Sequence, residues 1–110
     1  MDRKKERRLK AAGWTVGDAG DFLDLSDEER AFIETKLALA MAVRERRKRH
    51  KLSQTQLARR LGSSQSRVAK MEAADASVSL DLLVRSLLNL GATQADIAKA
   101  IRKGVSRSAA

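Results

Sequence analysis

The 110-residue sequence contains no cysteine and no proline, and only 3% of its residues are aromatic. Without cysteine, neither a disulfide nor a thiolate metal site can form. A single histidine excludes a histidine-cluster metal site and argues against triad catalysis. No apolar run approaches the roughly 18 residues of a membrane-spanning helix. We therefore expect a cytoplasmic protein with no membrane span, no metal and no cofactor.

The chain is strongly basic, with a formal net charge of +9, and its charge is unevenly distributed. Residues 1–10 and residues 44–51 each hold six basic side chains. Residues 18–34 have the opposite sign, with seven acidic side chains against Arg30 alone. We expect nucleic acid to contact residues 44–51, whereas the basic run at residues 1–10 is interpreted as a solvated face; carboxylates repel phosphate, so the acidic segment should not lie against DNA. The acidic segment is better suited to a basic partner or to the chain's own basic arm.

Serine and threonine caps, with glycine stops, divide the chain into five expected helices at about 26–50, 53–61, 64–72, 79–91 and 93–103. No segment alternates apolar and polar residues over the length of a strand, so the prediction is all-α. Three segments follow from this pattern. The first is an N-terminal extension (1–30), which consists of a basic arm, a glycine-containing loop and an acidic part. The second is a helical domain (31–103), and the third is a flexible basic tail (104–110).

Three apolar groups have alternative interpretations. A leucine stripe on the fourth expected helix is either core or a dimer surface: Leu80, Leu83, Leu87 and Leu90. Ile97 and Ile101 either join the core or form a two-fold interface. Four apolar side chains are expected to pack on the long first helix: Trp14, Phe22, Leu23 and Leu25. The first three have the alternative of contacting a partner.

Residues 54–71, QTQLARRLGSSQSRVAKM, have the spacing of two short helices joined by a tight turn. Four apolar side chains stand where two crossing helices share a core: Leu57, Leu61, Val68 and Met71. Ala58 is small at the expected crossing, and Gly62 suits a left-handed helix end. On the second helix, amide, hydroxyl and cationic side chains are left for solvent: Gln65, Ser66, Arg67 and Lys70. Such groups bond base edges and phosphates, which favours DNA binding over a purely structural hairpin.

The stretch LSQTQLARRLGSSQSRVAKME resembles the phage-repressor (XRE/Cro) family, and the similarity extends over residues 36–102. The resemblance implies a five-helix lambda-repressor-like helix-turn-helix fold with an N-terminal extension. It implies base contacts by three residues: Gln65, Ser66 and Lys70. It implies phosphate contacts by Gln54, Ser64 and Arg67, although Arg67 could also reach a base. Arg47 and Glu72 match an ion pair that braces the family fold.

The resulting hypothesis is a transcription regulator, an autorepressor that binds a palindromic double-stranded DNA operator as a homodimer. The alternative is a HigA-type antitoxin that also represses its own operon. Its extension, with Trp14, Phe22 and Leu23, would neutralise a RelE/HigB-like toxin. An enzyme is not expected, because the sequence has no phosphate-cradling glycine loop and no paired carboxylates facing a plausible cleft.

Overall fold

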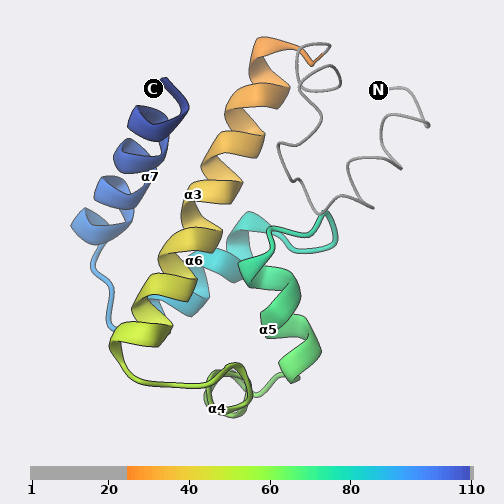
Figure 1. Ribbon diagram of the computed structural model, residues 1–110, viewed down its shortest axis with the longest axis vertical. Helices are drawn as coiled ribbons and strands as arrows, with labels where there is room; N and C mark the ends of the chain where they lie inside the picture. Colours follow the sequence, from red (N-terminus) through yellow and green to blue (C-terminus); the bar gives the residue numbers. More distant parts are fainter. Residues whose placement is uncertain (1–24, 110) are drawn as a thin grey trace.

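The computed structural model describes residues 25–109, which form five α-helices. They are α3 (Asp27–Arg49), α4 (Gln54–Leu61), α5 (Gln65–Glu72), α6 (Leu80–Asn89) and α7 (Gln94–Ala109), and Figure 1 shows their arrangement. No strand occurs within residues 25–109. The all-α, five-helix prediction is confirmed for this part of the chain.

The helices begin where the capping residues predicted them. The Oγ of Ser26 accepts the N–H of Glu29, and the carboxylate of Glu29 accepts the N–H of Ser26 in return. Ser53 and Gln56 make the same reciprocal pair at the start of α4. Each pair satisfies two backbone donors that have no partner inside the helix. Gly62 ends α4 with a φ of 66°, a conformation that a side chain disfavours.

Helix α7 is longer than its sequence pattern indicates. Thr93 and Asp96 cap its start as expected, but it continues beyond the predicted end near Lys103 to Ala109. Most of the segment expected to be a flexible tail is therefore helical. Gly104, which would normally weaken a helix interior, lies so close to Ala38 of α3 that an added Cβ would overlap the Ala38 side chain. Packing on α3 thus favours glycine at this position.

Helix α3 occupies the middle of the molecule, and α7 runs antiparallel to it on one side (Figure 1). The main core joins α3 to all the other helices. Its fully buried members include Val43, Leu57, Val68, Met71, Leu83, Leu87 and Leu90. The leucine stripe of α6 is therefore core, with Leu80 partly buried against it. Ile97 and Ile101 are partly buried against the same core.

A smaller apolar cluster covers the beginning of α3. Leu25 and Ile33 are buried together, and Leu37 packs against them and against the main core. Trp14, Phe22 and Leu23, which were expected either to pack here or to contact a partner, lie outside the described residues.

Lys36 of α3 is buried, with only 3% of its surface exposed. Burial lowers the pKa of its ammonium group, and the nearby Asp75 carboxylate partly opposes that shift.

None of the helices in residues 25–109 is long and apolar enough to cross a membrane. The same residues contain no group of three His, Cys, Asp or Glu side chains arranged to hold a metal ion.

Candidate nucleic-acid interface

Helices α4 and α5 are joined by residues 62–64 and share one packed core. Leu57 and Ala58 of α4 and Val68 and Met71 of α5 are each at most 3% exposed. These apolar faces place α5 against α3 and leave its opposite face in solvent. The geometry is that of a helix-turn-helix, in which the second helix can enter a DNA groove.

The exposed face of α5 carries the polar side chains expected to contact DNA. Gln65, Ser66, Arg67 and Lys70 are all exposed. The Oγ of Ser64 caps α5 by accepting the N–H of Arg67 at 3.1 Å. Because that bond uses an oxygen lone pair, the hydroxyl hydrogen of Ser64 is still available as a donor.

A hollow of about 270 Å³ lies beside the N-terminal part of α5. Its lining joins residues from α5, its cap and the α5–α6 loop: Ser64, Ser66, Arg67, Lys70, Ser77 and Val78. Two cations and the hydroxyl groups of Ser64 and Ser66 line this concave surface and can donate several hydrogen bonds to anionic oxygens.

Ser77 and Val78 are the part of this hollow that sequence reasoning missed. Asp75 turns the loop, because its Oδ1 accepts the N–H of Ser77 at 2.8 Å and the Ser77 hydroxyl at 2.6 Å. These two bonds lower the pKa of Asp75, as do the charges of Lys70 and Lys36. The Asp-x-Ser pattern is a turn signal that could have located the turn. It does not indicate that the turn lies beside α5.

Arg47 and Glu72 connect the end of α3 to the end of α5. The Nε of Arg47 lies 2.5 Å from Oε2 of Glu72, and its Nη2 donates to Oε1 at 3.0 Å. Nη1 of Arg47 also donates to the carbonyl oxygen of Leu52 at 2.7 Å. The two side chains are 11% and 5% exposed, so the bidentate pair is largely shielded from water. The hydrogen bond to Glu72 is the main reason that the pKa of Arg47 is raised.

The Arg47–Glu72 pair is the start of a longer chain of hydrogen bonds. The Nε2 of Gln54 donates to Oε1 of Glu72 at 3.3 Å, and the Nε2 of Gln65 donates to Oε1 of Gln54 at 2.7 Å. A buried ion pair is thereby linked to the first residue of α5. Within residues 25–109, the carbonyl oxygen and second amide hydrogen of Gln65 have no other partner.

Helix α4 is also hydrogen-bonded to α6. The Nε of Arg60 donates to Oδ1 of Asn89 at 2.8 Å, and its Nη2 donates to the Asn89 carbonyl oxygen at 2.7 Å. With the Arg47–Glu72 pair, this contact restrains both helices of the hairpin relative to the rest of the core.

A family model described as Helix-turn-helix matches residues 43–85. The match begins within α3, includes all of α4 and α5, and ends within α6. Comparisons with curated proteins and with solved structures gave no match. The matched segment coincides with the helices whose packing exposes the polar face of α5. Residues 43–85 therefore contain a helix-turn-helix domain of the XRE/Cro-like type.

Proposed function

We propose that this protein is a sequence-specific regulator of transcription that inserts α5 into the major groove of double-stranded DNA. The observation that carries the proposal is the exposed polar face of α5, with Gln65 oriented by Gln54. A helix displayed in this way fits the major groove, where the pattern of donors and acceptors differs for every base pair.

Gln65 is proposed to recognise a base directly. A glutamine amide bonds adenine through two contacts, to N6 and N7. Gln65 retains the carbonyl oxygen and the amide hydrogen that these contacts need while its other amide hydrogen is bonded to Gln54. Holding the side chain before DNA arrives reduces the entropy lost on binding. Ser66 and Lys70, four residues apart on α5, are proposed to contact neighbouring bases.

Phosphate contacts are proposed for Gln54, Ser64 and Arg67. Gln54 begins α4 and is partly exposed, so its backbone N–H lies at a helix N-terminus that attracts anions. Ser64 and Arg67 line the hollow beside α5, where a hydroxyl hydrogen and a guanidinium can both donate to phosphate oxygens. These contacts would position α5 and would supply most of the salt-dependent affinity.

The proposed functional unit is a homodimer on a palindromic operator. One helix reads only a few base pairs, and two copies separated by one DNA turn multiply the specificity. Bound at the promoter of its own gene, such a dimer would repress transcription by blocking polymerase.

Footprinting on the protein's own upstream DNA tests this proposal, with affinity measured over a range of salt concentrations. We expect a two-fold symmetric footprint and a log–log salt slope of about −0.9 per neutralised phosphate. Arg67→Gln should make the slope shallower by about one unit. Arg102→Gln, an exposed charge on α7, is the matched control and should not change it. A salt-insensitive interaction, or equal affinity for the upstream region and random DNA, would contradict the proposal.

A second candidate function is that of an antitoxin, which neutralises a basic RelE/HigB-like ribonuclease and represses its own operon. The supporting observation is the first half of α3, which precedes the segment matched to the DNA-binding family. Phe32 is 50% exposed there, close in sequence to the exposed acidic side chains of Asp27 and Glu28. An exposed aromatic residue near carboxylates suits a basic protein surface. DNA binding does not account for this exposed aromatic residue beside acidic side chains.

Co-expression with the adjacent open reading frame tests the antitoxin candidate through growth rescue. Rescue should survive Gln65→Ala combined with Lys70→Ala, which remove DNA contacts only. Rescue should be lost in Phe32→Ala or on deletion of residues 1–25. Rescue that instead disappears with the DNA-contacting side chains, or no rescue at all, would eliminate this candidate.

A further inference from the structure

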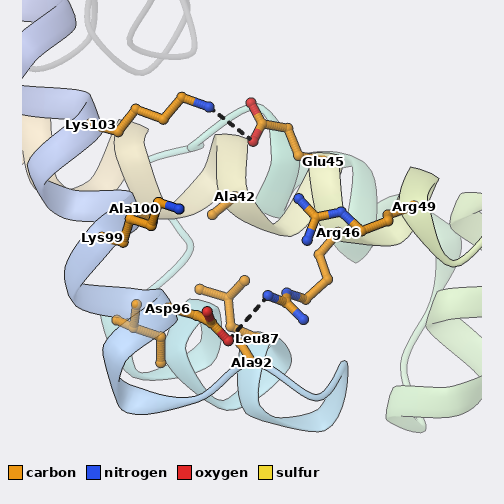
Figure 2. A pocket seen from close by; sticks show the side chains of 11 residues that line it. Ala42, Glu45, Arg46, Arg49, Leu87, Ala92, Asp96, Lys99, Ala100 and Lys103 are labelled. Atoms are coloured by element: carbon orange, nitrogen blue, oxygen red, sulfur yellow. Dashed lines mark ion pairs between the residues drawn. The ribbon is translucent and has the colours of Figure 1, made fainter.

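A cavity of about 180 Å³ opens between the second half of α3 and α7, with Leu87 of α6 in its lining. Figure 2 shows its side chains converging from the two facing helices. In Figure 1, α7 and α5 lie on opposite sides of α3, so this cavity is separate from the face of α5 proposed to contact DNA. None of the individual residues proposed to contact DNA lines this cavity.

The rim of the cavity has a surplus of positive charge. Four cations, Arg46, Arg49, Lys99 and Lys103, line it, together with only two carboxylates, those of Glu45 and Asp96. Each carboxylate already has a cationic partner. Arg46 lies 3.4 Å from Asp96, and Lys103 lies 4.0 Å from Glu45 (Figure 2). Within the described part of the chain, Arg49 and Lys99 have neither an ion pair nor a side-chain hydrogen bond.

Part of the cavity lining is apolar. Five of its eleven lining residues are small or aliphatic: Ala42, Leu87, Ala92, Ile97 and Ala100. An apolar protein cavity of about 150 Å³ is large enough to hold a benzene ring. The space between α3 and α7 is thus of the right size for the body of a small organic molecule with about six carbon atoms.

We propose that this cavity binds a small organic carboxylate. The apolar body of the ligand would rest on Ala42, Leu87 and Ile97, and its carboxylate would be bound by Arg49 and Lys99. A guanidinium presents two parallel N–H donors that match the two oxygens of a carboxylate. A monoanion suits the rim because a higher charge would be repelled by the two carboxylates already present.

Such a ligand would bridge α3 and α7 and would stabilise the folded protein in proportion to its occupancy. Arg49 belongs to the basic segment 44–51, but the ligand proposal rests on the lining of the cavity and does not depend on DNA binding.

Benzoate is a suitable probe, and its binding can be followed through the backbone amide resonances of the whole chain by NMR. We expect saturable shifts centred on Ala92, Ile97 and Ala100. Arg49→Gln should weaken benzoate binding about tenfold, the usual effect of losing one charge-assisted hydrogen bond. Arg102→Gln, an exposed cation on α7 outside the cavity, should leave the affinity unchanged. Benzamide, which has the same shape without the charge, should bind much more weakly than benzoate.

Inorganic phosphate and Ala100→Leu test the apolar half of the proposal. Phosphate should not reproduce the shifts, since it has no body to bury, and the leucine side chain should fill the cavity and abolish benzoate binding. The proposal is overturned by shifts that do not saturate or that spread over all basic surfaces. The proposal would also be overturned if benzoate and benzamide bound equally well, or if the Arg49→Gln and Arg102→Gln variants bound benzoate with the same affinity.

Discussion

Gln65 donates a 2.7 Å hydrogen bond from its side-chain amide to the Oε1 of Gln54, so the first residue of α5 is held by the first residue of α4. Sequence reasoning assigned these two residues separate roles, one on a base and the other on a phosphate. The hydrogen bond couples the proposed roles, because the side chain proposed to contact the backbone of DNA also orients the side chain proposed to contact a base. Gln54 is in turn bonded to Glu72, which is paired with Arg47.

Substitutions of Gln54 and Gln65 should therefore be non-additive. Gln65→Ala should weaken binding to the preferred operator by about 1–3 kcal/mol and relax the preference at one base pair. Gln54→Ala should weaken binding to all sequences and should also relax part of that same preference. Fluorescence anisotropy on the operator and its single-base variants, at one salt concentration, measures both effects. Additive losses in the double mutant would show that the two side chains act separately on DNA.

Removing one member of the buried Arg47–Glu72 pair should strongly destabilise the fold. Glu72→Ala leaves the Arg47 charge buried without its carboxylate partner, which should lower the free energy of unfolding by about 3–5 kcal/mol. The exposed pair between Arg85 and Asp81 is the matched control. Asp81→Ala should lower the free energy of unfolding by less than about 1 kcal/mol, because water screens that pair. Urea unfolding compares the two variants, and similar losses would contradict a structural role for the buried pair.

The double variant in which Gly104 and Ala38 are exchanged should be more stable than either single variant. Gly104→Ala improves helix propensity by about 1 kcal/mol but forces its new Cβ against Ala38. We expect net destabilisation of about 1–3 kcal/mol from overpacking. Adding Ala38→Gly should recover much of that loss by removing the opposing Cβ. Thermal unfolding of the three variants measures the coupling. Stabilisation by Gly104→Ala alone would show that α3 and α7 can separate without loss.

The stability of the α7 start should fall in acid. Hydrogen bonds from the N–H and hydroxyl of Thr93 lower the pKa of Asp96 below its usual 3.8, and the nearby Arg46 contributes. A group whose pKa is lower in the folded state stabilises that state above its unfolded pKa. The contribution is lost as the pH falls through the folded pKa. The stability difference between the native protein and Asp96→Asn should thus shrink as unfolding is measured from about pH 5 to pH 2. A difference that does not change with pH would contradict this interpretation.

Lys51 adopts a left-handed backbone conformation, with a φ of 58°. Its side chain is exposed, so replacing it removes no packing. Lys51→Gly should raise the free energy of unfolding by up to about 1 kcal/mol, since glycine avoids the strain but loses more backbone entropy on folding. Lys51→Ala is the control for loss of the side chain and should give no gain. Equal effects of the two substitutions in urea unfolding would show that the backbone is not strained there.

Local sequence signals located most of the helices correctly. The caps at Ser26, Ser53, Ser64 and Ser79 act over three residues, so their effect can be recognised without knowing the tertiary fold. The stop at Gly62 can be recognised in the same way, because glycine adopts the left-handed conformation that ends α4 without help from distant residues. The exposed face of α5 could also be predicted, because the apolar spacing of Val68 and Met71 leaves only one face for solvent.

Features that depend on contacts between distant residues were not predictable in this way. The close approach between Gly104 of α7 and Ala38 of α3 joins residues that are 66 apart in the sequence. The burial of Lys36 and the position of Ser77 beside α5 likewise follow from the packing of separate elements.

The amino-acid order alone accounts for the five helices of residues 25–109, most of their boundaries and the side chains that α5 presents, since caps and apolar periodicity act within a few residues. Packing between helices was needed to join Gln65 through Gln54 and Glu72 to Arg47, and to form the cavity between α3 and α7. The physical reason is the distance along the chain over which each interaction acts. A cap is satisfied by its neighbours in the chain, whereas a hydrogen-bond network or a cavity exists only when separate helices have docked at fixed distances.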